Sequence, residues 1–188
     1  VGKTTLLNML EAEADKRVLF WNCDEPDIRK KLSQPTSTQL KADIQGFELV
    51  LIDEAQRVPN IGLTLKLLID HSPEIQVVVT GSSALELSGA ITESLTGRKY
   101  EYCMFPISAE ELIAHNGWQT ERRMLERRLV YGTYPDVVNS AGEEREILSN
   151  LAGSYLYKDI FAFQDVRKPE IIEQLLQALA LQLGSEVS

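Results

Sequence analysis

Two short stretches of this sequence carry residue types that can bind and cleave a nucleoside triphosphate. The first, Val1-Gly2-Lys3-Thr4-Thr5, matches the second half of G-x-x-x-x-G-K-[ST]. Glycine lets the backbone approach a phosphate closely, and the N–H groups at the start of a helix point at the anion. We expect Lys3 to contact the β- and γ-phosphates and the Thr4 hydroxyl to join a Mg²⁺ shell. Val1, Gly2 and Thr5 complete the predicted nucleotide-binding segment.

The second stretch is an acidic pair, Asp53-Glu54, which follows the apolar run Phe47 to Ile52 and lies 50 positions beyond Lys3. An Asp at the carboxyl end of a central strand can hold Mg²⁺ opposite the loop threonine. The adjacent Glu54 is placed to orient or deprotonate the water that attacks the γ-phosphate. Acids also follow strands in ordinary turns, and Gly-Lys-Thr alone is a common tripeptide. The two motifs together predict an ATP and Mg²⁺ site.

Two further positions are candidates for a role in hydrolysis. A polar side chain at the tip of the strand beside the acidic one can contact the γ-phosphate or the water, and Ser82 is the first choice for it, with Thr80 second. Arg98 is either a finger that reaches the γ-phosphate, within a subunit or across an interface, or a surface arginine paired with an acid such as Glu101.

The pattern of apolar residues indicates the elements that must position these groups. Apolar runs separated by helical segments predict a parallel sheet covered on both faces, so the fold class is α/β, a P-loop core followed by a helical region. We expect a P-loop core over 1–107, a helical lid-like region over 108–165 and the beginning of a carboxyl-terminal domain over 166–188. The expected strands are 17–23, 47–52, 75–80 and 99–105. The expected helices are 4–14, 63–69, 121–131, 143–161 and 169–183. A further helix is expected to open at Ser108-Ala-Glu-Glu111, which resembles a capping box.

Composition excludes several classes of protein. Apolar residues at 44% and charged residues at 25% are typical of a globular chain, and no run approaches the roughly 20 apolar residues of a membrane span. The net charge of −9 argues against binding nucleic acid over the whole surface, although a local basic groove stays open. Cys23 and Cys103 stand far apart without neighbouring ligands, and His71 and His115 stand alone, so we expect a reduced, cytoplasmic protein without a metal cluster.

The order of the motifs resembles that of a known family. The chain is similar to the predicted AAA+ ATPases of bacteria and archaea, which have an amino-terminal ATPase domain followed by a carboxyl-terminal domain of unassigned function. The resemblance covers nearly the whole chain. It rests on Leu51 to Pro59, Thr80 to Ala84, Leu95 to Arg98, Phe105 to Ser108, Gly132 to Asp136, Tyr155 to Ile160 and Leu179 to Gly184.

The resemblance implies ATP binding and Mg²⁺-dependent hydrolysis, with Lys3, Thr4, Asp53 and Glu54 in the usual roles. The chain departs from the family at its front edge, because it begins inside the loop without the first strand and the opening glycine. We therefore expect this fragment itself to bind nucleotide weakly or not at all. Self-association or a protein partner, and a role for nucleic acid, stay open.

Two other functions fit the same motifs. In the ATPase half of a helicase, Asp53-Glu54-Ala-Gln would be the acidic box, but the gap from Lys3 to Asp53 is short and the region after 107 is helical. In a nucleotide-controlled switch, ATP holds one arrangement of domains and hydrolysis is incidental. The switch predicts one turnover or fewer for each bound nucleotide.

Overall fold

A computed structural model describes residues 2–81, 95, 97–153 and 169–182. Contacts between residues divide the chain into two compact units, Val1–Phe105 and Pro106–Ser188. The first unit holds a parallel sheet between helices and the second is helical, as the sequence predicts for the fold class. The finer division into three domains stays a prediction.

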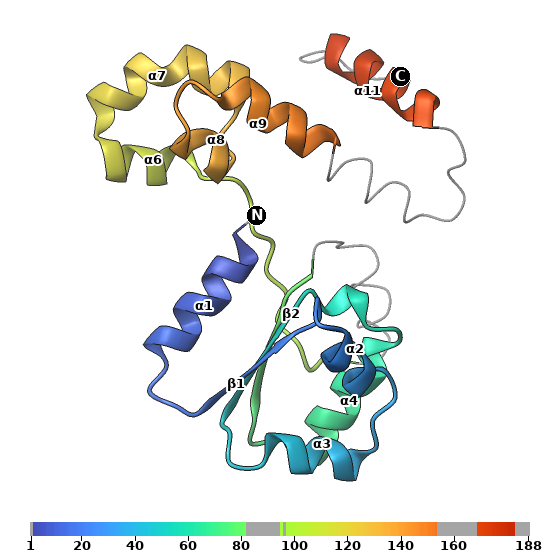
Figure 1. Cartoon of the computed structure of the whole chain (residues 1–188). Coiled ribbons are helices and arrows are strands. Elements are labelled where there is room, and N and C mark those ends of the chain that lie inside the picture. Colours follow the sequence, from blue (N-terminus) through green and yellow to red (C-terminus); the bar gives the residue numbers. More distant parts are fainter. Residues whose placement is uncertain (1, 82–94, 96, 154–168, 183–188) are drawn as a thin grey trace. The chain divides into compact units, whose positions relative to one another are not determined.

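The first unit is built on a parallel sheet whose described strands lie in the order β1-β2-β3 (Figure 1). In register, Asn22 at the end of β1 lies beside Asp53 at the end of β2, and Ile52 lies beside Val79 at the end of β3. Because the strands are parallel, their carboxyl ends meet at one edge of the sheet. The bounds are β1 Val18–Asn22, β2 Leu49–Asp53 and β3 Gln76–Val79.

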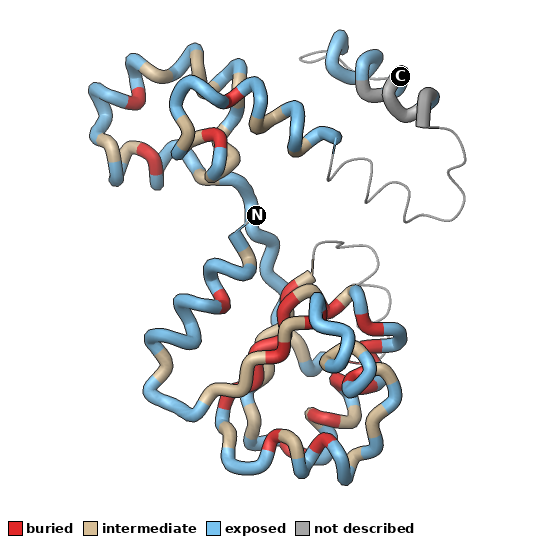
Figure 2. The backbone as a smooth tube through the Cα atoms, viewed as in Figure 1, coloured by how far each residue is buried: buried red, intermediate tan, exposed pale blue. Residues whose placement is uncertain are grey.

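The central strand β2 is buried at all five of its residues, and helices cover both of its faces (Figures 1 and 2). Leu49 and Leu51 point to one face, where Leu7 of α1 packs on them. Val50 and Ile52 point to the other face, in a core shared with α2, α3 and α4. A strand buried on both faces reads as a continuous apolar run, which is why the sequence identifies it readily. The helices are α1 Lys3–Glu13, α2 Pro26–Ser33, α3 Ser37–Ile44 and α4 Ile61–His71.

Two of these helices form in a polar stretch to which the sequence assigns no element. Helix α2 has a proline in its first turn, and α3 begins with a capping box between Thr36 and Gln39. Each helix turns only two apolar side chains inward, namely Ile28 and Leu32 from α2 and Leu40 and Ile44 from α3. Such a narrow apolar stripe gives little periodic signal.

The predicted fourth strand, 99–105, is wrong. These residues form no strand and pair with none among the described residues, and Tyr100, Tyr102 and Phe105 are largely exposed. Alternating apolar residues predict a strand only where another strand supplies hydrogen-bonding partners.

The second unit begins with a helix whose amino end the sequence predicts. Ser108 and Glu111 cap each other's backbone N–H groups and open α6. Helix α7 begins at Trp118, three residues before the predicted start, and α9 ends at Leu151, well before the predicted end at 161; residues 154–161 lie outside the described part. The helices are α6 Ala109–Asn116, α7 Trp118–Tyr131, α8 Pro135–Asn139, α9 Glu144–Leu151 and α11 Pro169–Leu181.

The nearly buried acids of this second unit pair with arginines of α7. Glu121 accepts hydrogen bonds from Arg128 at 3.0 and 3.1 Å and from Asn116 at 2.7 Å. Glu144 of α9 pairs with Arg127 of α7. Arg127 and Arg128 of α7 thus hold two acids that are nearly buried. Within the described residues, no helix is both long and apolar enough to cross a membrane.

Candidate functional site

The amino end of α1 begins at a glycine and has no side-chain cap. Gly2 precedes the helix with φ 68°, a left-handed conformation that glycine adopts without steric cost. No side chain caps the helix, and its first turn contains no acidic residue. The first N–H groups of a helix have no partner within it and carry a partial positive charge. They are therefore available to a phosphate.

Thr4, in the first turn of α1, contacts the acid at the end of β2. The Thr4 hydroxyl donates a hydrogen bond of 2.7 Å to Oδ2 of Asp53. Leu7 anchors this end of α1 on the sheet, so the loop and the strand are held together by the core beneath them. The first predicted motif and the second thus meet at the carboxyl edge of the sheet.

Asp53 is 3% exposed and accepts hydrogen bonds at both oxygens. Besides Thr4 at Oδ2, the Glu54 N–H donates to Oδ1 at 3.1 Å and the Thr80 hydroxyl donates to the same oxygen. All three donors are uncharged, and no lysine or arginine among the described residues forms an ion pair with Asp53. A buried carboxylate normally has a cationic partner. The environment of Asp53 is therefore suited to a cation supplied from outside the chain.

The oxygen ligands that this site offers fit Mg²⁺. The Thr4 hydroxyl and the Asp53 carboxylate are hard oxygen ligands, which Mg²⁺ prefers. The described residues contain no group of three or more His, Cys, Asp or Glu that could hold a metal by itself. Magnesium is commonly bound by one or two protein oxygens, with phosphate and water completing its shell. A bound nucleotide would supply the remaining ligands.

Glu54 follows directly, in an unusual backbone conformation. Its φ of 54° and ψ of 39° are left-handed, which a residue other than glycine adopts at a cost of roughly 1–2 kcal/mol. Such strain is often found at functional sites. The carboxylate is partly exposed and accepts a hydrogen bond of 2.6 Å from the Gln56 side chain.

Thr80 fastens the end of β3 to this acidic turn. Its hydroxyl donates to Asp53, and its carbonyl oxygen accepts a hydrogen bond of 2.9 Å from the Ala55 N–H. The side chain that the sequence ranks second on this strand therefore reaches the site. Ser82, the first choice, and Val1 lie outside the described residues, so their roles stay predictions.

Lys3 and Thr5 flank Thr4 in the first turn of α1. Lys3 is half-buried and forms no ion pair with the described residues, and Thr5 is exposed. An unpaired ammonium group at the positive end of a helix has no local attraction to hold it there. A negatively charged ligand would provide one.

Arg98 lies against α4 and not against the acidic pair. Its guanidinium pairs with Asp70, and Glu101, the partner suggested from the sequence, pairs with Lys99 at 3.0 Å. An arginine finger at this position would have to exchange Asp70 for a phosphate. That role stays a prediction.

Sequence reasoning missed the neighbours contributed by the end of β1. The Cys23 N–H donates a hydrogen bond of 3.0 Å to the Asp53 carbonyl oxygen, and Asp24 pairs with Arg57 at 2.5 Å. Burial, followed by the charges of Asp53, Asp24 and Glu54, raises the pKa of the Cys23 thiol to about 11, while Arg29 opposes this shift. Both cysteines are free, Cys23 buried and Cys103 exposed. Finding these neighbours would have required knowing that β1 and β2 lie side by side in parallel, which the sequence alone does not show.

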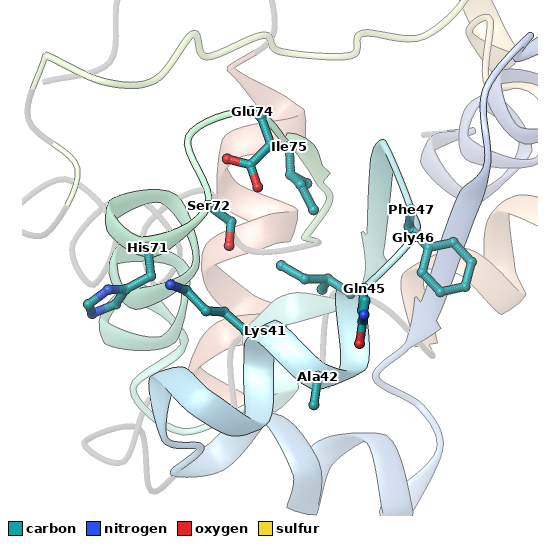
Figure 3. A pocket seen from close by; sticks show the side chains of 10 residues that line it. Lys41, Ala42, Gln45, Gly46, Phe47, His71, Ser72, Glu74 and Ile75 are labelled. Carbon is teal, nitrogen blue, oxygen red and sulfur yellow. The ribbon is translucent and has the colours of Figure 1, made fainter.

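A hollow of about 440 Å³ lies at the opposite edge of the sheet (Figure 3). It is lined by the carboxyl ends of α3 and α4 and by the residues that lead into β2 and β3, so it is remote from Asp53. Lys41 and His71 stand in the last turns of those two helices, where positive charge offsets the helix dipole. Together with Glu74 they form a lining of mixed charge that selects no one ligand, and we assign the functional site to the edge that holds Asp53.

A parallel sheet whose strand ends bring together a glycine–lysine–threonine helix start and a buried aspartate defines the P-loop class of nucleotide-binding domains. Residues 1–113 match the AAA domain family, and the chain belongs to that family. Residues 122–188 match a domain of unknown function, DUF8612. The resemblance drawn from the sequence is confirmed in both parts, and the first unit is an ATPase-like P-loop domain.

Relatives occur in distant bacteria and archaea. An uncharacterized protein of Haemophilus influenzae is 29% identical over 174 residues, which are 89% of this chain and 42% of that protein. One of Methanocaldococcus jannaschii is 22% identical over 163 residues, 80% of this chain and 36% of that protein. One of Mycobacterium tuberculosis is 30% identical over 99 residues, which are 52% of this chain and 21% of that protein. The chain thus spans less than half the length of these relatives, and no solved structure matches it.

Proposed function

We propose that the full-length protein binds ATP with Mg²⁺ and hydrolyses it at the carboxyl edge of the sheet. The observation that carries this proposal is the hydrogen bond of 2.7 Å between the Thr4 hydroxyl and the buried Asp53 carboxylate. It unites the two motifs of the sequence in one place. Bound Mg²⁺ would be held by Thr4 and Asp53 and would neutralise charge on the phosphate oxygens.

The residues of the chain divide the work of hydrolysis between them. The amides at the start of α1 and the Lys3 ammonium bind the phosphates, and Glu54 orients the attacking water. Water oxygen bonds to the γ-phosphorus as the bond from phosphorus to the β,γ-bridging oxygen breaks. One water proton passes to the Glu54 carboxylate and then to solvent. The products are ADP, which keeps the bridging oxygen, and inorganic phosphate.

The test is steady-state phosphate release by the full-length protein, alongside titration of a labelled nucleotide. Glu54→Gln should lower turnover by roughly 10²- to 10⁴-fold, because glutamine cannot accept the proton, while nucleotide affinity stays within about threefold. Glu11→Gln on the exposed part of α1 is the matched control and should change neither.

The same measurements separate the proposal from its alternatives. One turnover or fewer for each bound nucleotide over long times would instead support a nucleotide-controlled switch. Turnover that depends strongly on single-stranded nucleic acid would support the helicase alternative. Absence of nucleotide binding by the full-length protein would refute the proposal.

A further inference from the structure

The turn that carries Glu54 is fixed at its backbone. The Glu54 N–H donates to Asp53 Oδ1 at 3.1 Å and approaches the Thr80 hydroxyl at 3.4 Å, and the Arg57 N–H donates to the Glu54 carbonyl oxygen at 3.0 Å. Residues Ala55–Arg57 form a short 3₁₀ turn. With the main chain held from both sides, the direction of the Glu54 carboxylate depends on its side-chain torsions alone.

Those torsions are restrained from one side. Gln56 Nε2 donates to Glu54 Oε2 at 2.6 Å, and Arg57 Nε lies 4.0 Å from the same oxygen. The other oxygen, Oε1, accepts no hydrogen bond from the described residues. One oxygen of the carboxylate is thus held, and the other is left to accept a hydrogen bond from water.

Arg57 is itself held from a neighbouring strand. Its Nε pairs with Asp24 Oδ1 at 2.5 Å, and Asp24 follows β1. The Asp24 backbone is fixed in turn, because its N–H donates to the Asn22 side chain and its carbonyl oxygen accepts from Arg29. The chain of contacts therefore runs from the end of β1, through Arg57, to the carboxylate that follows β2.

These contacts are poorly suited to a purely stabilising role. The Arg57 side chain is 46% exposed and that of Asp24 is 51% exposed, and ion pairs so open to solvent contribute little to stability. Their effect is to restrict the positions that the Glu54 carboxylate can take. A small displacement of a group that orients a nucleophile can slow the reaction greatly.

We propose that Gln56, supported by Arg57 and Asp24, is a positioning residue that aims the Glu54 carboxylate at the attacking water. This inference rests on the proposed hydrolysis of ATP. Gln56 holds Oε2 directly. Arg57, at its longer distance, limits the swing of the carboxylate, and Asp24 limits the swing of Arg57.

The experiment compares Gln56→Leu with the wild-type full-length protein by steady-state phosphate release and by titration of a labelled nucleotide. Leucine removes the donor at nearly the same size, so we expect kcat to fall about 10- to 100-fold, with KM and nucleotide Kd within about twofold. Gln119→Leu, at an exposed position of α7, is the matched control and should leave kcat unchanged. Arg57→Ala should lower kcat by about threefold, and Arg57→Lys should restore most of the loss, since lysine can still pair with Asp24.

A double substitution distinguishes positioning from a structural role. If Gln56 acts only through Glu54, adding Gln56→Leu to Glu54→Gln will lower kcat no further. Additive losses, or a weakened nucleotide Kd in Gln56→Leu, would overturn the inference, as would an unchanged kcat. A wild-type protein without turnover would overturn the proposed function itself, and that result is seen before any Gln56 variant is measured.

Discussion

The two units of the molecule each bury a carboxylate, and they satisfy it differently. Asp53, in the first unit, receives hydrogen bonds only from uncharged donors. Glu121, in the second unit, is 8% exposed and receives two hydrogen bonds from the Arg128 guanidinium and one from an amide. Arg128 holds the pKa of Glu121 below its ordinary value, with a smaller contribution from Asn116.

The difference lies in the charge that compensates for each buried acid. Burying a charge is costly unless another charge compensates for it. For Glu121 the compensating charge is within the fold, so the pair is complete and joins two turns of α7. For Asp53 the described residues supply no such charge. A cation held between Asp53 and a bound phosphate would supply it.

The largest expected effect is on turnover, from replacing Asp53 with its neutral isostere. Asp53→Asn should lower Mg²⁺-dependent turnover of the full-length protein on the order of 100-fold or more, because the charge that attracts the cation is gone. It should change the free energy of unfolding by no more than about 1 kcal/mol, since the amide oxygen still accepts from Thr80 and Glu54. Phosphate release and thermal unfolding measure the two quantities. A large loss of stability with little change in turnover would make Asp53 structural.

The next largest expected effect is on nucleotide affinity, from replacing Lys3 in the first turn of α1. Lys3→Ala should weaken binding of labelled ATP by about 10- to 100-fold, the value of a charge-assisted hydrogen bond to phosphate. Lys16→Ala, which removes an exposed lysine beyond the other end of α1, is the control and should leave the affinity unchanged. Equal affinities of Lys3→Ala and the wild-type protein would defeat the assignment of Lys3.

The third effect is on stability, in the second unit. Glu121→Gln should destabilise the protein by about 1–3 kcal/mol, because it leaves the Arg128 guanidinium partly buried without its counter-charge. Nucleotide affinity should not change. Thermal unfolding followed by circular dichroism gives the first quantity, with exposed Glu126→Gln as the control on the same helix. Loss of nucleotide binding in Glu121→Gln would remove the contrast between the two acids.

Whether the sequence predicts the surroundings of an acid depends on whether its contacts are local or come from distant parts of the chain. Asp53 was predictable, because a strand buried on both faces is a continuous apolar run and the parallel register fixes where its end lies. The position of Thr4 beside Asp53 was predictable from motif spacing, and the role of Lys3 stays a prediction. The Gln56 and Arg57 contacts with Glu54 were not, because they depend on a left-handed turn that no residue in the sequence signals. Asp24 required knowledge of which strands are neighbours.

The same limits apply to the fold. The capping box at Ser108 and the buried strands are local signals, and they were read correctly. The strand predicted over 99–105 failed because strand formation depends on a partner elsewhere in the chain. Helices α2 and α3 were missed because their stability comes from Leu32, Leu40 and Ile44 packing into the core that they share with α4, a tertiary effect with little local trace.

A fourth, smaller effect is the response of Glu121 to acid. Its pKa in the folded protein lies below the ordinary 4.5, so the unfolded chain takes up the proton more readily. The stabilisation by Arg128 is therefore complete above about pH 4.5 and is lost as the pH falls through the folded pKa. Thermal unfolding of the wild-type protein and Glu121→Gln at several pH values between 7 and 3 tests this. The difference in stability between the two should shrink in acid, and a constant difference would contradict the assignment.

The smallest expected effect uses Cys23 as a reporter of charge at the site. Burial contributes most to raising the pKa of this thiol to about 11, and the Asp53 carboxylate is the next largest cause. Asp53→Asn should therefore lower the pKa of Cys23 only in part, and Glu121→Gln should not move it. The pH profile of thiolate absorbance in a Cys103→Ser background measures it. Since the folded pKa lies above the ordinary 9.0, stability should decline as the pH rises between about 9 and 11, and less steeply in Asp53→Asn. An unchanged Cys23 profile in Asp53→Asn would contradict an electrostatic contribution of Asp53 to the thiol, and Cys23 would then not report charge at the site.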